Sequence, residues 1–245
     1  MNNNKDSYLS SLGCLFPQNE YELDLFEKQN KNMDFKLNES DLDPYSILKS
    51  IKADIPIRSK SHNFFQRSVL AAKITHDCYH EKTFGRVKFQ KMVYLCENVS
   101  KMNFATNYSK QAAGPMDNKF IYSVQKLFET QKWFSTIKEK STKKVHFLPL
   151  ENVNGYKKYY ERNYKEVHHE IQKLIETFKT WKSDDVELVA TIHSCWCEIK
   201  NENSDFSEDL LITKVYAWHE KKQRFSEKRI KQFIDWMRDN NFHPN

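Results

Sequence analysis

Apolar residues recur at helical spacing in three segments between residues 58 and 130. The segments cover residues 64–78, 88–96 and 118–128, and each places its apolar side chains on one face, which predicts three helices. Asp117 precedes the third segment, and its carboxylate can accept hydrogen bonds from the free N–H groups of a first helical turn. We therefore expect the third helix to begin at this N-cap.

Two short apolar segments, residues 133–138 and 145–148, flank a lysine-rich run and predict a β-hairpin. Helix, helix, helix and hairpin is the element order of a winged helix. We therefore expect residues 58–150 to form a winged-helix-like domain with a small β-hairpin as its wing.

A narrow apolar seam follows, with residues spaced alternately four and three apart. This spacing over residues 160–181 predicts one long helix. We interpret residues 151–183 as a long linking helix that packs either between domains or against its own copy in a homodimer. The seam residues are Tyr160, Tyr164, Val167, Ile171, Leu174, Phe178 and Trp181.

Residues 184–245 have the pattern of three short helices, of which the second and third begin after the capping residues Ser207 and Ser226. These two helices are joined by residues 218–225 (WHEKKQRF), which we call the connector. The connector places basic side chains between aromatic ones. This arrangement predicts a helix-turn-helix-like three-helix domain. The predicted fold class is therefore mainly α, with a winged-helix-like domain, a long linking helix and a C-terminal three-helix domain.

Residues 1–57 differ from the rest of the chain in charge. They carry 6 Lys and 10 Asp or Glu, whereas residues 58–245 carry 33 basic and 23 acidic residues. They are rich in Asn and show no sustained period, which predicts an acidic, weakly structured arm. Its apolar residues are Leu23, Leu25 and Phe26. They either dock on a partner or on the basic residues 58–245 of this chain, or they belong to a flexible tail.

The composition argues against cofactor and metal chemistry. The 4 glycines lie far apart, whereas the phosphate cradles of dinucleotide-binding and P-loop proteins need clustered glycines, so we expect no cofactor. The 5 cysteines lack the spacing of a zinc site, so we expect reduced thiols. His76 with His80, and His193 with Cys197, are pairs one helical turn apart, but neither pair has an identifiable third ligand, so we expect no metal.

The chain has no feature of a membrane or secreted protein. No apolar run approaches the ~20 residues of a membrane span. The first residues, MNNNKDSYLSS, lack the basic-then-apolar pattern of a secretory signal. We therefore expect a cytoplasmic protein without membrane contact.

Two lysine-rich clusters are candidate phosphate contacts, because flexible cations meet a nucleic-acid backbone with little geometric demand. Glu139, Glu220 and Glu227 dilute the clusters, so an ordinary solvated surface is the alternative. The candidates are Lys138, Lys140, Lys143 and Lys144 at the wing tip, and Lys221, Lys222, Arg224, Lys228 and Arg229 around the connector.

Arg162, followed by His168 and His169, resembles the loose Arg-x4–6-His motif of HEPN ribonucleases. That resemblance implies a histidine acting as general base on a ribose hydroxyl and an arginine stabilising the phosphorane charge. On one long helix, however, the seam turns Arg162 and His169 outward, where no cleft excludes water. We therefore expect a non-enzymatic protein and keep a metal-independent ribonuclease as the alternative.

Residues 88–95 (KFQKMVYL), followed by Gly114-Pro115, are similar to the "KLQKLLYL … GP" pattern of the Panacea antitoxin domain. Residues 84–134 also resemble a module at the C-termini of type I restriction specificity subunits, and the resemblance extends over residues 64–245. It implies a non-catalytic component of a bacterial defence system that contacts DNA and a protein partner such as a toxin, nuclease or restriction subunit.

The same resemblance implies a role for one turn. It makes Gly114, Pro115, Met116, Asp117 and Asn118 a surface loop that contacts the partner. A plain turn with a helix cap is the alternative for this segment. A purely protein-binding antitoxin or assembly subunit is the alternative for the chain.

Overall fold

The computed structural model describes residues 57–244 apart from 103, 105 and 203–204. The interpretation of the acidic arm, with Leu23, Leu25 and Phe26, lies outside the described residues. The elements are α4 (Ile57–Cys78), α5 (Arg86–Val99), β1 (Ser109–Gln111), β2 (Gly114–Met116), α6 (Asn118–Thr130), β3 (Phe134–Lys138), β4 (Val145–Pro149), α7 (Lys157–Tyr164), α8 (His168–Phe178), α9 (Ser183–Asn201), α10 (Glu208–Trp218), the 3-10 helix η2 (Glu220–Arg224) and α11 (Glu227–Asp239).

The described part of the chain is mainly helical, as the apolar spacing predicted, with eight α-helices and two antiparallel hairpins. Asp117, Ser207 and Ser226 are N-caps, as predicted. Each side chain accepts a hydrogen bond from the backbone N–H three residues later. The polar side chains therefore satisfy donors that a helix start leaves free.

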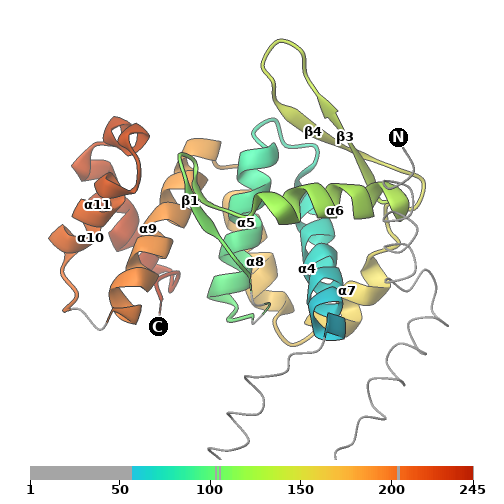
Figure 1. The fold of residues 1–245 in the computed structure, drawn as a ribbon, viewed down its shortest axis with the longest axis horizontal. Helices are drawn as coiled ribbons and strands as arrows, with labels where there is room; N and C mark the ends of the chain where they lie inside the picture. The colour runs from blue at the N-terminus through green and yellow to red at the C-terminus, as the bar shows by residue number, and fades with distance from the viewer. Residues whose placement is uncertain (1–56, 103, 105, 203–204, 245) are drawn as a thin grey trace, which may run out of the picture. The chain divides into compact units, whose positions relative to one another are not determined.

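Residues 66–245 form one compact unit. Within it, α5 is buried along most of its length and packs against α8 and α9, and α9 in turn packs against α10 and α11 (Figure 1). The predicted domain boundaries at residues 150 and 183 stay predictions. None of the helices in the described residues combines the length and apolar character needed to cross a bilayer.

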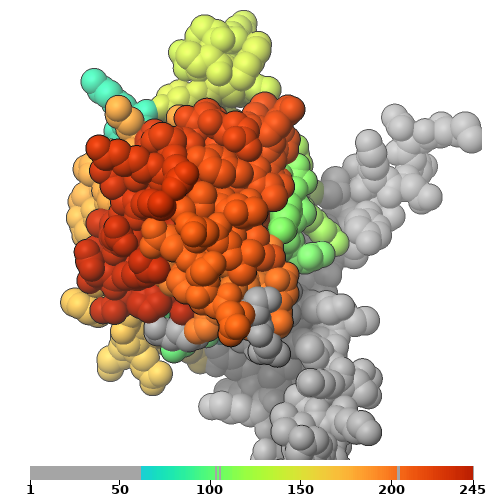
Figure 2. Space-filling model, turned by 90° about the vertical axis from the view of Figure 1, so that its left-hand side faces the viewer, coloured from blue at the N-terminus to red at the C-terminus, as the bar shows by residue number. Residues whose placement is uncertain are grey.

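The predicted hairpin forms from β3 and β4, with Thr136 opposite Phe147. Phe147 is buried and its ring lies 5.0 Å from that of Phe89 in α5. The other face of the hairpin is open, with Ile137 54% and Leu148 39% exposed. One face therefore anchors the hairpin, while its tip projects beyond the helices in two perpendicular views (Figures 1 and 2).

The prediction of one long helix in residues 151–183 is wrong. A turn at residues 165–167 divides this section into α7 and α8. Most of the seam is buried within the chain, at Tyr160, Tyr164, Ile171, Leu174 and Phe178, and its two halves face different neighbours. Tyr164 in α7 donates a hydrogen bond to the carbonyl of Gln66 in α4, whereas α8 packs against α5. A straight helix cannot follow both partners, so the chain turns between them.

The prediction of a surface loop at Gly114-Pro115 is also wrong for these two residues. They lie in β2, which pairs with β1, and both are buried. Gly114 has φ +89°, and a Cβ atom there would lie 2.7 Å from the Thr191 hydroxyl oxygen. Glycine is required at this position because only it adopts this φ without strain and leaves room for α9.

Candidate nucleic-acid interface

The hairpin tip carries the first cluster of sequence-predicted cations. Lys138, Lys140 and Lys143 are exposed, and no ion pair involves them among the residues that the structure describes. Lys144 is half-buried and its Nζ donates to the carbonyl of Lys82. Three of the four predicted lysines therefore present their charge to solvent.

Glu139, the acid inside this cluster, is engaged by polar neighbours on the hairpin. Thr142 Oγ1 donates to one of its carboxylate oxygens at 2.5 Å and Ser141 Oγ to the other at 3.1 Å. His146 Nε2 lies 3.6 Å away. The hydrogen bonds from Thr142 and Ser141 lower the pKa of Glu139. The carboxylate therefore stays charged, but it is directed at the turn and not at the lysines.

Helix α6 extends this basic surface. Its outward positions Lys119, Tyr122 and Lys126 are exposed, and Tyr122 is 64% exposed. The Arg86 guanidinium carbon lies 4.8 Å from the centre of the Tyr122 ring. A hydrogen bond from Arg86 lowers the pKa of Tyr122, and the nearby charge of Lys138 acts in the same direction. The start of α5, the outward face of α6 and the hairpin therefore meet.

We call this region the hairpin surface. Sequence reasoning found only its hairpin part. The part on α6 could have been found from the spacing of positions 119, 122 and 126, which places them together on the polar face of an amphipathic helix. The hairpin surface consists of Arg86, Lys119, Tyr122, Lys126, Lys138, Lys140, Lys143 and Lys144.

A buried ionic cluster positions α6. Arg67 in α4 donates to Glu97 at 2.5 Å and to Asp117 at 2.6 Å, and its guanidinium carbon lies 3.7 Å above the ring of Phe120. Tyr108 accepts a third bond from Arg67 and donates to Glu97. The N-cap of α6 is thus fixed to α4 and α5. Sequence reasoning missed this cluster because its members are up to 50 residues apart.

The second cluster of predicted cations is arranged differently. Lys222 is fully buried, and its Nζ donates to Glu187 at 2.7 Å. Its prediction as a surface phosphate contact is therefore wrong, because no phosphate can reach its amine. Arg224 pairs with Asp184 and Glu187, and Arg229 pairs with Asp185.

The acids that engage these cations come from the first two turns of α9. Lys221 and Lys228 remain exposed, but they flank neutralised neighbours. The structure therefore does not bring the five connector cations together into one free basic patch.

The predicted partner loop lies mostly inside the molecule. Lys91 Nζ donates to the carbonyl of Pro115, and burial lowers the pKa of Lys91 to about 7. Asp117 is held by Arg67, Met116 is half-buried, and only Asn118 is exposed. The two halves of the motif, residues 88–95 and Gly114-Pro115, therefore touch through Lys91.

The predicted catalytic alternative is spread over two helices. Arg162 is exposed in the last turn of α7, whereas His168 and His169 begin α8. His168 Nδ1 hydrogen-bonds the Tyr160 hydroxyl at 3.1 Å. The single helix from which the outward orientation of Arg162 and His169 was predicted is therefore not present, although both residues are exposed.

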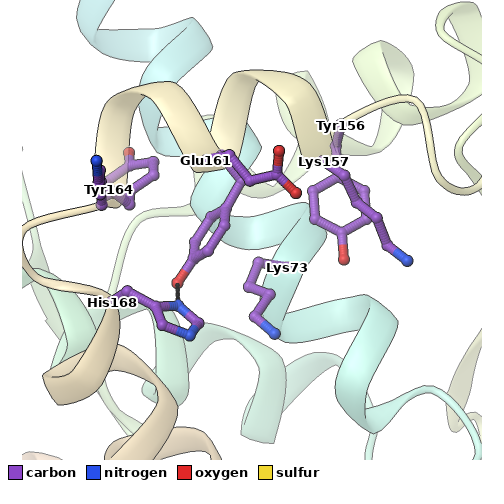
Figure 3. A pocket seen from close by; sticks show the side chains of 8 residues that line it. Lys73, Tyr156, Lys157, Glu161, Tyr164 and His168 are labelled. Carbon is purple, nitrogen blue, oxygen red and sulfur yellow. Dashed lines mark hydrogen bonds between the residues drawn. The ribbon is translucent and has the colours of Figure 1, made fainter.

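His168 also lines a cavity of 520 Å³ in which neither Arg162 nor His169 takes part (Figure 3). The cavity lies beside α4, α7 and the start of α8. Lys73 of α4 reaches into it, and its Nζ pairs with Asp77 at 2.8 Å. The lining residues are Lys73, Tyr156, Lys157, Tyr160, Glu161, Tyr164, Lys165 and His168.

In the described part of the chain, no group of three or more His, Cys, Asp or Glu side chains has an arrangement that could hold a metal ion. His193 is buried between Tyr94 and Cys197. Burial lowers the pKa of His193 to about 4 and raises that of Cys197 to about 11. Both groups are therefore neutral near pH 7 and unsuited to nucleophilic catalysis.

A scan against protein-family models matches none of them, and a search of curated proteins finds no matching relative. The resemblance of residues 88–95 and 114–115 to antitoxin and restriction modules therefore rests on the sequence pattern.

Proposed function

We propose that this protein binds duplex DNA without catalysis, through the hairpin surface. The observation that carries this proposal is the projecting hairpin, whose exposed lysines at positions 138, 140 and 143 have no acidic partner among the described residues. Cations that are exposed and unpaired can neutralise phosphates and release counterions, whereas cations already held by carboxylates gain little from a phosphate.

The order of elements supports the same assignment. Helix α6 is followed directly by the β3–β4 hairpin, as a recognition helix is followed by the wing in a winged-helix protein. In this arrangement α6 presents Lys119, Tyr122 and Lys126 to a groove, while the hairpin lysines follow the phosphate backbone. Most of the contacts are cationic, so binding is expected to depend steeply on salt and weakly on sequence.

We assign a different part of the function to the C-terminal helices α9, α10 and α11. These helices have a helix-turn-helix-like order, but their cations Lys222, Arg224 and Arg229 form ion pairs with acids of the same protein. This favours a supporting or protein-binding role over DNA contact. With the resemblance to restriction and antitoxin modules, it suggests a cytoplasmic bacterial defence component with a toxin, nuclease or restriction subunit as partner.

The proposal is tested by fluorescence anisotropy with a labelled duplex of about 20 base pairs at ~50 mM salt, where electrostatic binding is strong. The test variant is Lys140→Ala/Lys143→Ala. The matched control is Lys221→Ala/Lys228→Ala, because it removes the same charge from exposed lysines on the connector. We expect the hairpin variant to lose about tenfold or more in affinity and its salt slope to fall by about 2.

The control should bind within about twofold of the unchanged protein. Equal losses in both variants would show that the whole basic body attracts DNA and that the hairpin surface is not the site. Absence of duplex binding by the unchanged protein at this salt concentration would reject the proposal altogether.

A further inference from the structure

We propose that the hairpin surface prefers DNA in which a duplex continues into an unpaired strand, and that Tyr122 stacks on a base of that strand. This preference rests on the proposed function, because the same surface must hold the adjoining duplex. Contact with phosphates alone gives no use to the exposed ring of Tyr122 in α6.

The exposure of this ring is unusual in the part of the chain that the structure describes. There, Tyr122 and Phe206 are the two exposed aromatic side chains, and Tyr122 is the more exposed, at 64% against 40%. Aromatic rings contribute most when their surface is covered, by the core or by a ligand. Tyr122 therefore keeps most of its ring available for contact with a second molecule.

The ring is also held in position. Its neighbours in α6, Ile121 and Val124, are fully buried, so the helix is anchored beneath it. The Arg86 guanidinium carbon lies 4.8 Å from the centre of the ring, and Arg86 hydrogen-bonds the hydroxyl group. A side chain that is ordered before binding loses little conformational entropy when a ligand stacks on it.

Cations surround the ring. Lys119 and Lys126 lie three residues before and four residues after Tyr122, which places all three on one face of α6. Helix α6 packs against β3 (Figure 1), and the charge of Lys138 at the end of β3 reaches Tyr122. Phosphates on either side of a stacked base therefore meet cations. An aromatic platform within a basic surface is the arrangement that binds single-stranded nucleic acid.

The pairing state of the DNA decides whether the ring of Tyr122 takes part in binding. In a duplex, neighbouring base pairs cover the faces of each base, and the grooves present base edges. An unpaired strand exposes base faces, and these stack on aromatic side chains with little dependence on sequence. The lysines of the hairpin surface therefore act on both forms of DNA, whereas Tyr122 distinguishes them.

The experiment is fluorescence anisotropy of the full chain with two labelled probes at roughly 0.1 M salt. Both probes contain the same duplex of about 20 base pairs and a single-stranded tail of about five nucleotides. The tail carries adenine in one probe and is abasic in the other. The two tails have equal numbers of phosphates, so the ratio of the two affinities reports the bases alone. We expect the adenine tail to bind about tenfold more tightly.

The test variant is Tyr122→Leu, which keeps an apolar side chain and removes the ring. The matched control is Phe206→Leu, because Phe206 is the other exposed aromatic residue and precedes α10, outside the hairpin surface. We expect the ratio to fall to about one in Tyr122→Leu and to stay near tenfold in the control. Tyr122→Phe keeps the ring and should retain the ratio within about threefold.

Equal affinity of the unchanged protein for the two tails would overturn the preference. An equal fall of the ratio in Tyr122→Leu and Phe206→Leu would do the same, since it would show that Tyr122 is not the platform. Failure of the proposed function is measured separately, on a blunt duplex with Lys140→Ala/Lys143→Ala. If those lysines matter for the blunt duplex while the two tails bind equally, the proposed function stands and the preference is wrong.

Discussion

Two lysine-rich segments of this protein, residues 138–144 and 219–229, look alike in sequence and have opposite surroundings in the structure. In the hairpin, Lys140 and Lys143 point to solvent. In the connector, Lys222 is fully buried against Glu187. The comparison shows that cation density along a sequence does not measure how much charge a surface offers to a ligand.

The difference originates in α9. Its first two turns carry Asp184, Asp185 and Glu187, where acids also interact favourably with the helix N-terminus. The connector folds against these acids, and its cations are neutralised there. The hairpin tip projects beyond the helices (Figures 1 and 2), and its acid, Glu139, is occupied by the turn.

Glu187→Gln should lower the free energy of unfolding by about 3–5 kcal/mol, because it leaves Lys222 buried without its counter-charge. Urea denaturation measures this change. Glu139→Gln in the hairpin is the matched control and should leave the urea midpoint unchanged. The double variant Glu187→Gln/Lys222→Met should recover much of the loss. If Glu187→Gln is as stable as the unchanged protein, the buried pair does not hold the connector.

Lys91, which lies in the same charged neighbourhood as Glu187 and Lys222, should make stability rise with pH. Burial lowers its pKa from 10.5 to about 7. Between these values the unfolded chain holds a proton that the folded chain lacks, so the free energy of unfolding increases with pH. Between pH 7 and 9 the contribution is about 2 kcal/mol.

Comparison with Lys91→Met isolates this contribution, because the variant should show a flatter dependence over the same pH window. Urea denaturation at pH 7, 8 and 9 measures it. Measurements stop at pH 9 because burial raises the pKa of thiols such as those of Cys78 and Cys195 in the folded protein. At higher pH the unfolded chain loses thiol protons that the folded chain keeps, and this favours unfolding. Parallel pH profiles for the two proteins would contradict a low pKa at Lys91.

Glu139→Gln should increase duplex affinity by about fivefold at roughly 0.1 M salt, because it removes the negative charge from the hairpin tip. Glu227→Gln removes an exposed carboxylate from the connector, where it pairs with Lys231. This control should leave the affinity within about twofold of the unchanged protein. Anisotropy titrations compare the two. An equal gain from both changes would indicate that only net charge matters.

Arg224→Ala should have the smallest effect. Its side chain is 43% exposed, and its contacts with Asp184 and Glu187 are 3.2 and 3.1 Å long. Partly exposed pairs contribute about 0–1 kcal/mol, so urea denaturation should show a loss of that size. A loss comparable to that of Glu187→Gln would mean that Arg224, and not Lys222, is the principal partner of Glu187.

Most of the helices and the β3–β4 hairpin could be predicted because their signals are local, whereas the break between α7 and α8 was not predicted. Apolar spacing fixed the helical segments, and Asp117, Ser207 and Ser226 fixed three helix starts. The β1–β2 hairpin was missed, since its strands have three residues each and too little pattern to detect. Within the hairpin surface, the sequence predicted the lysines of the β3–β4 hairpin. It did not predict Arg86, Tyr122 or the two lysines of α6, Lys119 and Lys126.

Local sequence signals specify the buried faces of most helices, the starts of three of them and the segments that are rich in cations. These properties depend on residues within a few positions of one another. The tertiary structure alone decided that Lys222 is enclosed while Lys140 is free, that the seam bends between α7 and α8, and that Lys91 meets Pro115. The reason is physical: the free energy of a charge depends on its solvent and its counter-charge, and distant segments supply both.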